Sequence, residues 1–284
     1  SGTLLACTWN PDIIYKVGEC AAKEVKENNI GVWLTPALNI HTNPLCGRNF
    51  EYFSEDPLIA GKSAAALTKG VQSQKIAVSA KHFAANNKEV NRCCIDSRIS
   101  ERALREIYLK GFEICVKESD PWTIMTSYNL INGCHSSENY ELITGILRNE
   151  WGFKGIVVTD WGAANDRVLG LKNGNDLEMP SSAGAGAKKI VEAVKNGELD
   201  EAILNQRALN MLNLIKKAVD GSKENYEYYR VEEPENPEED EEENMDRVMG
   251  NYIRTIFRDL DGTVVENVED YMKLDEKATL YPPQ

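Results

Sequence analysis

The chain has 284 residues, of which 42% are hydrophobic and 27% charged, a composition ordinary for a soluble globular protein with one large α/β domain or two smaller ones. No apolar run approaches the roughly 18 residues that a membrane-spanning helix requires, and no secretory signal opens the chain. The net charge of −13 comes mostly from nine acidic side chains between residues 232 and 243, so the rest of the chain is nearly neutral and lacks the basic face that nucleic acid or an anionic membrane requires.

Strands and helices alternate along the first three quarters of the chain. Apolar residues at helical spacing predict helices at residues 11–28, 57–72, 100–118, 140–151, 165–172, 185–196 and 200–219. Short buried apolar runs predict strands at residues 31–40, 76–80, 122–128, 156–159 and 176–179. The connections at 41–56 and 84–99 are long and polar, as segments that carry function often are.

Helix boundaries are marked by capping residues. Asn10, Asp56 and Ser100 each stand directly before a predicted helix and are expected to act as N-caps. The helix that follows Ser100 is expected to bury Ile107 together with Leu104, Leu109, Phe112, Ile114 and Val116.

This alternation predicts an α/β fold with right-handed parallel crossovers. A (β/α)8-type TIM barrel, incomplete at its N-terminal end, is the first expectation, and an open doubly wound sheet is the second. No Gly-x-Gly-x-x-Gly follows any strand, so a dinucleotide site has no support. The expected domains are a barrel-like catalytic domain at residues 1–221, an acidic disordered linker at 222–245, and a C-terminal helical extension at 246–284 that either docks on the barrel or binds a partner.

Cysteine and histidine usage limits the chemistry. The seven cysteines include no Cys-x-x-Cys pair and their number is odd, so they do not form a disulfide framework. The three histidines lie far apart in sequence, and we expect neither a metal site nor another cofactor. Buried thiols in a reducing compartment favour the cytoplasm.

Polar and aromatic side chains follow the predicted strands. They are Arg48, Lys81, His82, Tyr128, Asp160 and Trp161. Cations and a hydroxyl around one carboxylate, with an indole beside them, suit a neutral ligand rich in hydroxyls, such as a sugar. The cations are expected to keep Asp160 ionised, as a glycosidase nucleophile must be. The simpler alternatives are that Asp160 caps the next helix, that Lys81 and His82 are a surface pair, and that Trp161 belongs to the core.

Four ordered motifs carry a family resemblance. They are HTNPLCGRNFEYFSEDP at 41–57, KHFAANN at 81–87, MTSYN at 125–129 and VTDWG at 158–162. Together they resemble glycoside hydrolase family 3, and the form GRNFE is more similar to its β-glucosidases than to its β-xylosidases. The Lys-His-Phe-Pro-Gly-His loop of the family's N-acetylglucosaminidases is replaced here by Ala84-Ala85-Asn86, which disfavours that activity.

The resemblance implies a TIM barrel and a retaining mechanism acting on terminal β-D-glucosyl residues. Asp160 would attack the anomeric carbon, and Arg48, Lys81 and His82 would bind the hydroxyls of the glycone. In the same reading, the pocket wall beside the nucleophile is formed by Met125, Tyr128 and Trp161, with support from Arg92 and Glu55.

The resemblance also implies parts that this sequence does not match. The family's acid/base is usually a glutamate on a second, sandwich domain, and an Asp-Gly-Pro segment usually precedes the first helix. We therefore expect the acid/base from a second chain or domain, as in members whose sandwich precedes the barrel; Glu178 is the one internal residue to check. The alternatives are a non-catalytic carbohydrate-binding or structural fragment, a β-xylosidase, and an incomplete barrel completed by oligomerisation.

Overall fold

Four parallel strands form the centre of the fold in the computed structural model, which describes residues 1–223. In spatial order they are β1 (Val32–Trp33), β2 (Ala77–Phe83), β4 (Thr123–Thr126) and β7 (Ile156–Thr159). Each strand pairs with the next one along the chain, and a bridge between Val158 and Leu177 continues the order. The predicted α/β class with a parallel sheet is confirmed.

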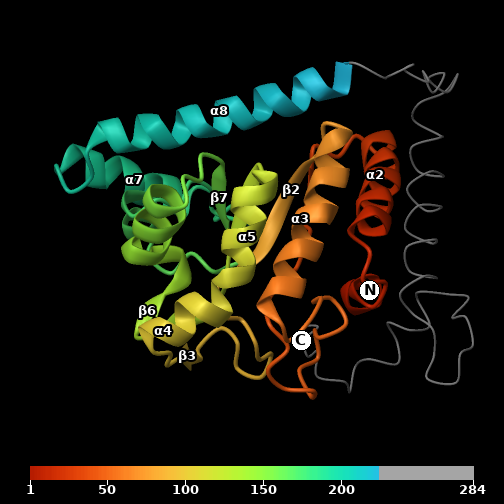
Figure 1. Cartoon of the computed structure of the whole chain (residues 1–284). Helices are drawn as coiled ribbons and strands as arrows, with labels where there is room; N and C mark the ends of the chain where they lie inside the picture. The colour runs from red at the N-terminus through yellow and green to blue at the C-terminus, as the bar shows by residue number, and fades with distance from the viewer. Residues whose placement is uncertain (224–284) are drawn as a thin grey trace, which may run out of the picture. The chain divides into compact units, whose positions relative to one another are not determined.

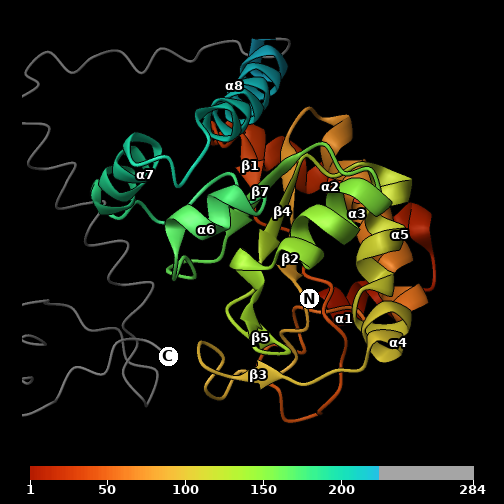
Figure 2. The same ribbon diagram turned by 90° about the vertical axis from the view of Figure 1, so that its left-hand side faces the viewer.

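A second, smaller sheet was not predicted from the sequence. It has three strands, β3 (Asp96–Ser97), β5 (Leu130–Ile131) and β6 (Cys134–His135), and it lies below the main strands in Figure 2. Its strands are two residues long, too short for any periodicity to be read in them.

Helices and helical turns connect the strands. They are α1 (Gly2–Ala6), α2 (Pro11–Glu27), α3 (Pro57–Ser73), α4 (Glu101–Ala103), the π-helical η1 (Leu104–Tyr108), α5 (Lys110–Ser119), the 3-10 helix η2 (Ser136–Glu138), the π-helical η3 (Glu141–Glu150), α6 (Arg167–Lys172), α7 (Ala185–Lys195) and α8 (Glu201–Lys223). The three predicted N-caps are confirmed, because the side chains of Asn10, Asp56 and Ser100 each accept a hydrogen bond from a backbone N–H of the helix that follows.

Helices α2, α3 and α5 lie side by side along one side of the strands, while α6 and α7 lie on the other (Figures 1 and 2). The approach of α2 to α3 depends on glycines. A Cβ built on Gly70 would lie 2.1 Å from the carbonyl oxygen of Tyr15, and one on Gly18 would lie 2.6 Å from that of Leu67. The two backbones are therefore closer than any larger residue at these positions would allow.

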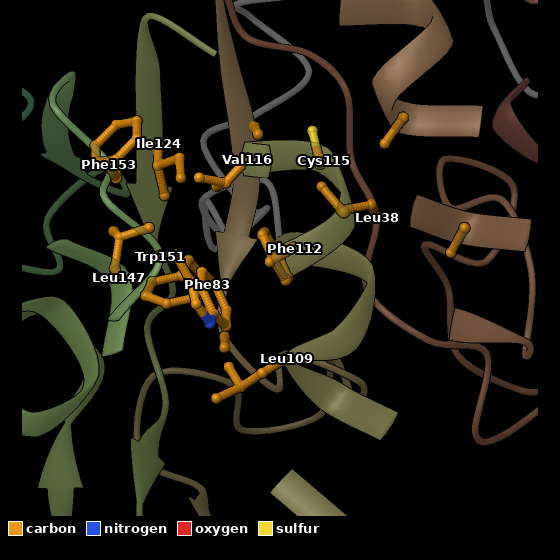
Figure 3. Close-up of a cluster of buried hydrophobic side chains, with 14 of the residues drawn as sticks. Leu38, Phe83, Leu109, Phe112, Cys115, Val116, Ile124, Leu147, Trp151 and Phe153 are labelled. Atoms are coloured by element: carbon orange, nitrogen blue, oxygen red, sulfur yellow. The ribbon is translucent and has the colours of Figure 1, made fainter. Parts of the chain in front are cut away.

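Aromatic side chains fill the space between α5 and the sheet (Figure 3). The ring of Phe83 lies edge-on to Phe112, with centroids 5.2 Å apart, and to Trp151, at 6.0 Å. Both phenylalanines are fully buried. Burying a Phe side chain contributes about 1.5–3 kcal/mol, so this cluster fixes the end of β2, which carries Lys81 and His82.

Three expectations about local structure are wrong. The first is the strand predicted at 176–179, where only Leu177 forms a bridge, to Val158. Only Val32 and Trp33 of the predicted strand at 31–40 form a strand, because the N–H of Thr35 turns back to the carbonyl of Trp33 and Pro36 has no N–H to donate. Ile107 is 41% exposed, because the π-turn over Leu104–Tyr108 adds a residue to the helix and rotates it out of the core.

Helix α8 lies across the amino ends of the strands (Figure 1), where Asn210 and Lys217 face Trp122 and Ile156. The predicted linker and extension, residues 222–245 and 246–284, fall outside the described residues except for the first two, which end α8. Within residues 1–223 no helix combines the length and apolar character needed to cross a bilayer.

Candidate active site

The polar side chains predicted to meet at the strand ends do meet there. Asp160 follows β7 directly, and its N–H donates to the carbonyl of Thr126, the last residue of β4, at 3.1 Å. The carbonyl of Asp160 accepts from the N–H of Ala163 at 3.0 Å. Strand β4 and the turn after Asp160 thus hold the backbone at this carboxylate, which is the rigid support that a reacting group requires.

The two carboxylate oxygens of Asp160 have different surroundings. Oδ1 accepts a hydrogen bond from the N–H of Trp161 at 2.7 Å, whereas Oδ2 is buried and has no hydrogen-bond partner among the described residues. The nearest helix, α6, is capped by Asp166 instead, so the alternative that Asp160 is an N-cap is wrong. A buried carboxylate oxygen without a partner is costly for folding alone and is typical of a functional position.

His82 lies beside that oxygen, with its Nε2 atom 3.6 Å from Oδ2 of Asp160. The histidine is 1% exposed, and burial, with the cations Arg48, Lys81 and Arg92, lowers its pKa well below the usual range. The ring is therefore neutral near pH 7 and forms no ion pair with Asp160. It is a core-packed polar group, not a member of a surface pair.

Arg48 and Lys81 are joined by a carboxylate that the sequence did not single out. Glu51 accepts from Nε of Arg48 at 2.7 Å through one oxygen and from Nζ of Lys81 at 2.8 Å through the other. All three side chains are at least three-quarters buried. Arg48 also donates through Nη2 to Nε2 of His82 at 3.0 Å. One carboxylate thus sets the positions of both cations.

Tyr128 and Trp161 form a second group of side chains near Asp160. The hydroxyl of Tyr128 donates to the carbonyl of Trp161 at 2.8 Å, and the guanidinium of Arg92 lies 4.7 Å from the centre of the Tyr128 ring. Burial and the negative charge of Asp160 raise the pKa of Tyr128 to about 12. The Trp161 side chain is 42% exposed, so it is not a core residue and presents an apolar surface beside the carboxylate.

Arg92 joins this group through Glu89. Glu89 lies 2.8 Å from Nη1 of Arg92 and 4.0 Å from Nη1 of Arg48. It therefore connects the cation over Tyr128 with the cation beside His82, and the supporting position expected for Arg92 agrees with the structure.

The remaining predicted residues differ in how they relate to the site. Met125 is buried on β4, where it is paired with Val158, two residues before Asp160. Glu55 is exposed and touches only its neighbour Ser54 among the contacts of the described chain, so the structure does not bring it into the site. Glu178 accepts from Ser182 at 3.1 Å and lies 3.9 Å from Arg167, and no contact within residues 1–223 links it to Asp160.

Sequence reasoning missed Glu51, Glu89 and Tyr52, whose hydroxyl lies 3.4 Å from Nδ1 of His82. Glu51 and Glu89 each stand three residues from an arginine of the site, a spacing that could have indicated both ion pairs. No sequence signal points to Tyr52, because a buried tyrosine is far more often a core residue. No group of three or more potential metal ligands occurs in residues 1–223.

The arrangement can bind a neutral polyhydroxyl molecule and attack it with a carboxylate. Fixed cations provide donors, neutral His82 provides an acceptor, and Trp161 provides a flat apolar surface. Oδ2 of Asp160, which has no hydrogen-bond partner among residues 1–223, is a carboxylate oxygen of the kind that can attack such a ligand.

Comparison with known proteins supports this chemistry. The model of the glycosyl hydrolase family 3 N-terminal domain matches residues 2–214. The chain is 50% identical over 224 residues to thermostable beta-glucosidase B of Acetivibrio thermocellus, covering 79% of this chain and 30% of that protein. It is 51% identical over 213 residues to an exo-alpha-(1->6)-L-arabinopyranosidase of Bifidobacterium breve, covering 75% of this chain and 28% of that protein.

A solved structure agrees in fold. Beta-glucosidase 3B from Thermotoga neapolitana, in complex with glycerol, superimposes with a TM-score of 0.76 at 45% identity, covering 84% of this chain and 34% of the other. The chain therefore spans about a third or less of the length of these relatives.

Proposed function

The chain belongs to glycoside hydrolase family 3, and from this premise we propose that it carries the nucleophile of a retaining glycosidase that removes terminal β-D-glucosyl residues. One observation supports the proposal above the others: Oδ2 of Asp160 is buried, has no hydrogen-bond partner within residues 1–223, and lies 3.6 Å from the neutral ring of His82. Similarity to beta-glucosidase B of Acetivibrio thermocellus favours a glucoside as the substrate.

The proposed first step is a displacement at the anomeric carbon. Oδ2 of Asp160 forms a bond to that carbon while the bond to the leaving-group oxygen breaks, which gives a covalent glycosyl ester. Arg48, Lys81 and His82 bind hydroxyls of the glycone, Met125 and Tyr128 line the pocket, and Trp161 covers an apolar face of the sugar.

The leaving group also needs a proton. A retaining enzyme places its two carboxyls about 5–5.5 Å apart. Within the described part of the chain, Glu178 is held by Ser182 and Arg167, and Glu51 and Glu89 are paired with site cations. We therefore propose that the acid/base is a glutamate from a second chain or domain.

We also propose that the parallel strands belong to a (β/α)8 barrel. In a doubly wound sheet the strand order reverses at a switch point, whereas in a barrel each strand neighbours the next along the chain. The order β1-β2-β4-β7, continued by the bridge at Leu177, follows the chain without reversal.

An aryl β-glucoside with an excellent leaving group tests the proposed function, because such a substrate barely needs the acid. We expect a burst of aryl alcohol and, with a fluorosugar trap, a covalent adduct on the peptide that contains Asp160. Asp160→Asn should lower the rate of the burst by about four orders of magnitude or more. Absence of both burst and adduct would favour a non-catalytic carbohydrate-binding fragment.

Substrate choice needs a second measurement, because one relative is an arabinopyranosidase. Aryl β-D-glucoside, α-L-arabinopyranoside and β-D-xyloside should be compared by kcat/KM. A higher kcat/KM for the glucoside supports the proposal. A higher kcat/KM for the arabinopyranoside or the xyloside would contradict it and make that glycoside the substrate class.

A further inference from the structure

The backbone of His82 is held by the side chain of a buried asparagine. Asn39, which is 2% exposed, donates through Nδ2 to the carbonyl of His82 at 2.9 Å and accepts at Oδ1 from its N–H at 2.8 Å. These two hydrogen bonds fix the backbone of His82. They therefore limit where the imidazole ring and its two nitrogens can lie.

The two nitrogens have different partners. Nε2 lies 3.0 Å from Nη2 of Arg48, and Nδ1 lies 3.4 Å from the hydroxyl of Tyr52. A guanidinium has only donors, so Nε2 must be the acceptor in this pair. In a neutral ring the proton then lies on Nδ1, which donates to Oη of Tyr52.

The Tyr52 hydroxyl can complete the chain of hydrogen bonds. Having accepted from His82, it directs its own proton to the carbonyl of Asn86, 3.5 Å away. Tyr52 is 0% exposed, and burial raises its pKa, so the hydroxyl keeps the proton that this chain requires. The opposite tautomer would turn an N–H of His82 toward an N–H of Arg48 and leave Nδ1 as an acceptor.

We propose that Tyr52 is a positioning residue that, together with Arg48, holds His82 as the Nδ1–H tautomer and thereby presents Nε2 as an acceptor beside Asp160. In the functional part, which rests on the proposed glycosidase activity, a substrate hydroxyl replaces Arg48 as the donor to Nε2, whose single lone pair accepts one hydrogen bond at a time. Because Nε2 carries no proton, His82 does not donate to Oδ2 of Asp160, and that oxygen remains available to attack.

Nitrogen NMR of the full chain tests the tautomer without any need for turnover. The chain has only three histidines, and the variants His41→Gln and His135→Gln leave the signal of His82 assigned by elimination. After labelling with 15N-histidine, we expect long-range proton–nitrogen correlations to show Nδ1 protonated and Nε2 unprotonated at pH 7. A protonated Nε2 in the unmodified chain would overturn the proposal.

Tyr52→Phe removes one oxygen and keeps the ring. We expect the Nδ1–H form to lose its dominance in this variant, with the signals of His41 and His135 unchanged as evidence of folding. Tyr140→Phe is the matched control, because Tyr140 is 54% exposed on the surface. An unchanged His82 spectrum in Tyr52→Phe would show that Tyr52 does not determine the tautomer.

Kinetics with the aryl glucoside test the functional part separately. Loss of a buried hydrogen bond that orients an acceptor should lower kcat/KM about tenfold in Tyr52→Phe, with KM carrying most of the change, and leave Tyr140→Phe unaffected. A changed tautomer with unchanged kcat/KM would refute the role in substrate binding. If the unmodified chain shows no turnover, the proposed function fails, while the NMR result still decides the tautomer.

Discussion

Nζ of Lys81 lies 2.8 Å from Oε1 of Glu51, in a pair whose two side chains are less than a quarter exposed. The other oxygen of Glu51 binds Arg48. Two cations proposed to bind the substrate therefore depend on one carboxylate that need not touch the substrate itself.

Glu51→Gln should weaken substrate binding more than it slows the chemical step. The amide cannot accept charge-assisted bonds from both cations, so both lose their fixed positions. We expect KM for the aryl glucoside to rise about tenfold with a smaller change in kcat. Glu55→Gln is the matched control, since Glu55 lies on the same loop but is exposed, and a KM that rises equally in both variants would contradict the prediction.

Asp176→Asn should destabilise the fold. The carboxylate, with a fully buried side chain, accepts from Arg148 at 2.6 Å, the N–H of Val157 at 2.7 Å and Asn210 at 2.9 Å. Removing one partner of a buried ion pair costs about 3–5 kcal/mol, which urea unfolding followed by circular dichroism would measure. Glu106→Gln, which affects an exposed pair with Arg102, should leave the midpoint unchanged.

Gly70→Ala should separate α2 from α3. The added methyl group would overlap the carbonyl oxygen of Tyr15, which belongs to backbone and cannot rotate away. We expect a loss of roughly 1–3 kcal/mol, despite the better helix propensity of alanine. Gly47→Ala, with no atom within 4 Å of the new methyl, should show no such loss, and equal unfolding midpoints would refute the argument.

The stability of the chain should fall on mild acidification because of His82. The pKa of His82 is lowered in the folded state. Below the unfolded-state pKa of about 6.5, the unfolded chain therefore binds more protons at this residue than the folded chain does. As a result, the free energy of unfolding decreases as the pH falls. Once the pH is well below 6.5, the loss of unfolding free energy that is due to His82 approaches about 1.4 kcal/mol per pH unit. His82→Gln should reduce the loss measured between pH 7.5 and 5.5, whereas His135→Gln, which keeps His82, should retain it.

Three of the four central strands and most helices could be predicted because each depends on a local pattern. The apolar run before Asp160 forms β7 with the predicted bounds, and Asp56 caps α3 through a side chain that reaches only two and three residues ahead. The strand at 31–40 could not be predicted correctly, because the bond from Thr35 to Trp33 interrupts the pairing with β2, which resumes only as a bridge between Ala37 and Lys81. The π-turn that exposes Ile107 likewise has no signature in hydrophobic spacing.

The chemistry of the site was partly predictable for a similar reason. Asp160 follows β7 and His82 lies at the end of β2, and the carboxyl ends of parallel strands meet at one edge, so the proximity of these two residues follows from the fold class. The accessory groups were not predictable, because Tyr52 and Glu89 lie on loops and reach the site through side-chain contacts with His82 and Arg48. Such contacts depend on tertiary packing that no local pattern records.

Strand β7 has a buried carboxylate near each of its ends. Asp160 follows its last residue, and Asp176 receives the N–H of Val157 near its first. Three residues of extended chain lead from Val157 to Asp160, a span of about 10 Å. Within residues 1–223, the hydrogen bonds and ion pairs of the two carboxylates share no residue. The effects of substitutions this far apart without shared partners are usually additive, so the stability contributed by Asp176 and the reactivity proposed for Asp160 can be adjusted as nearly independent traits.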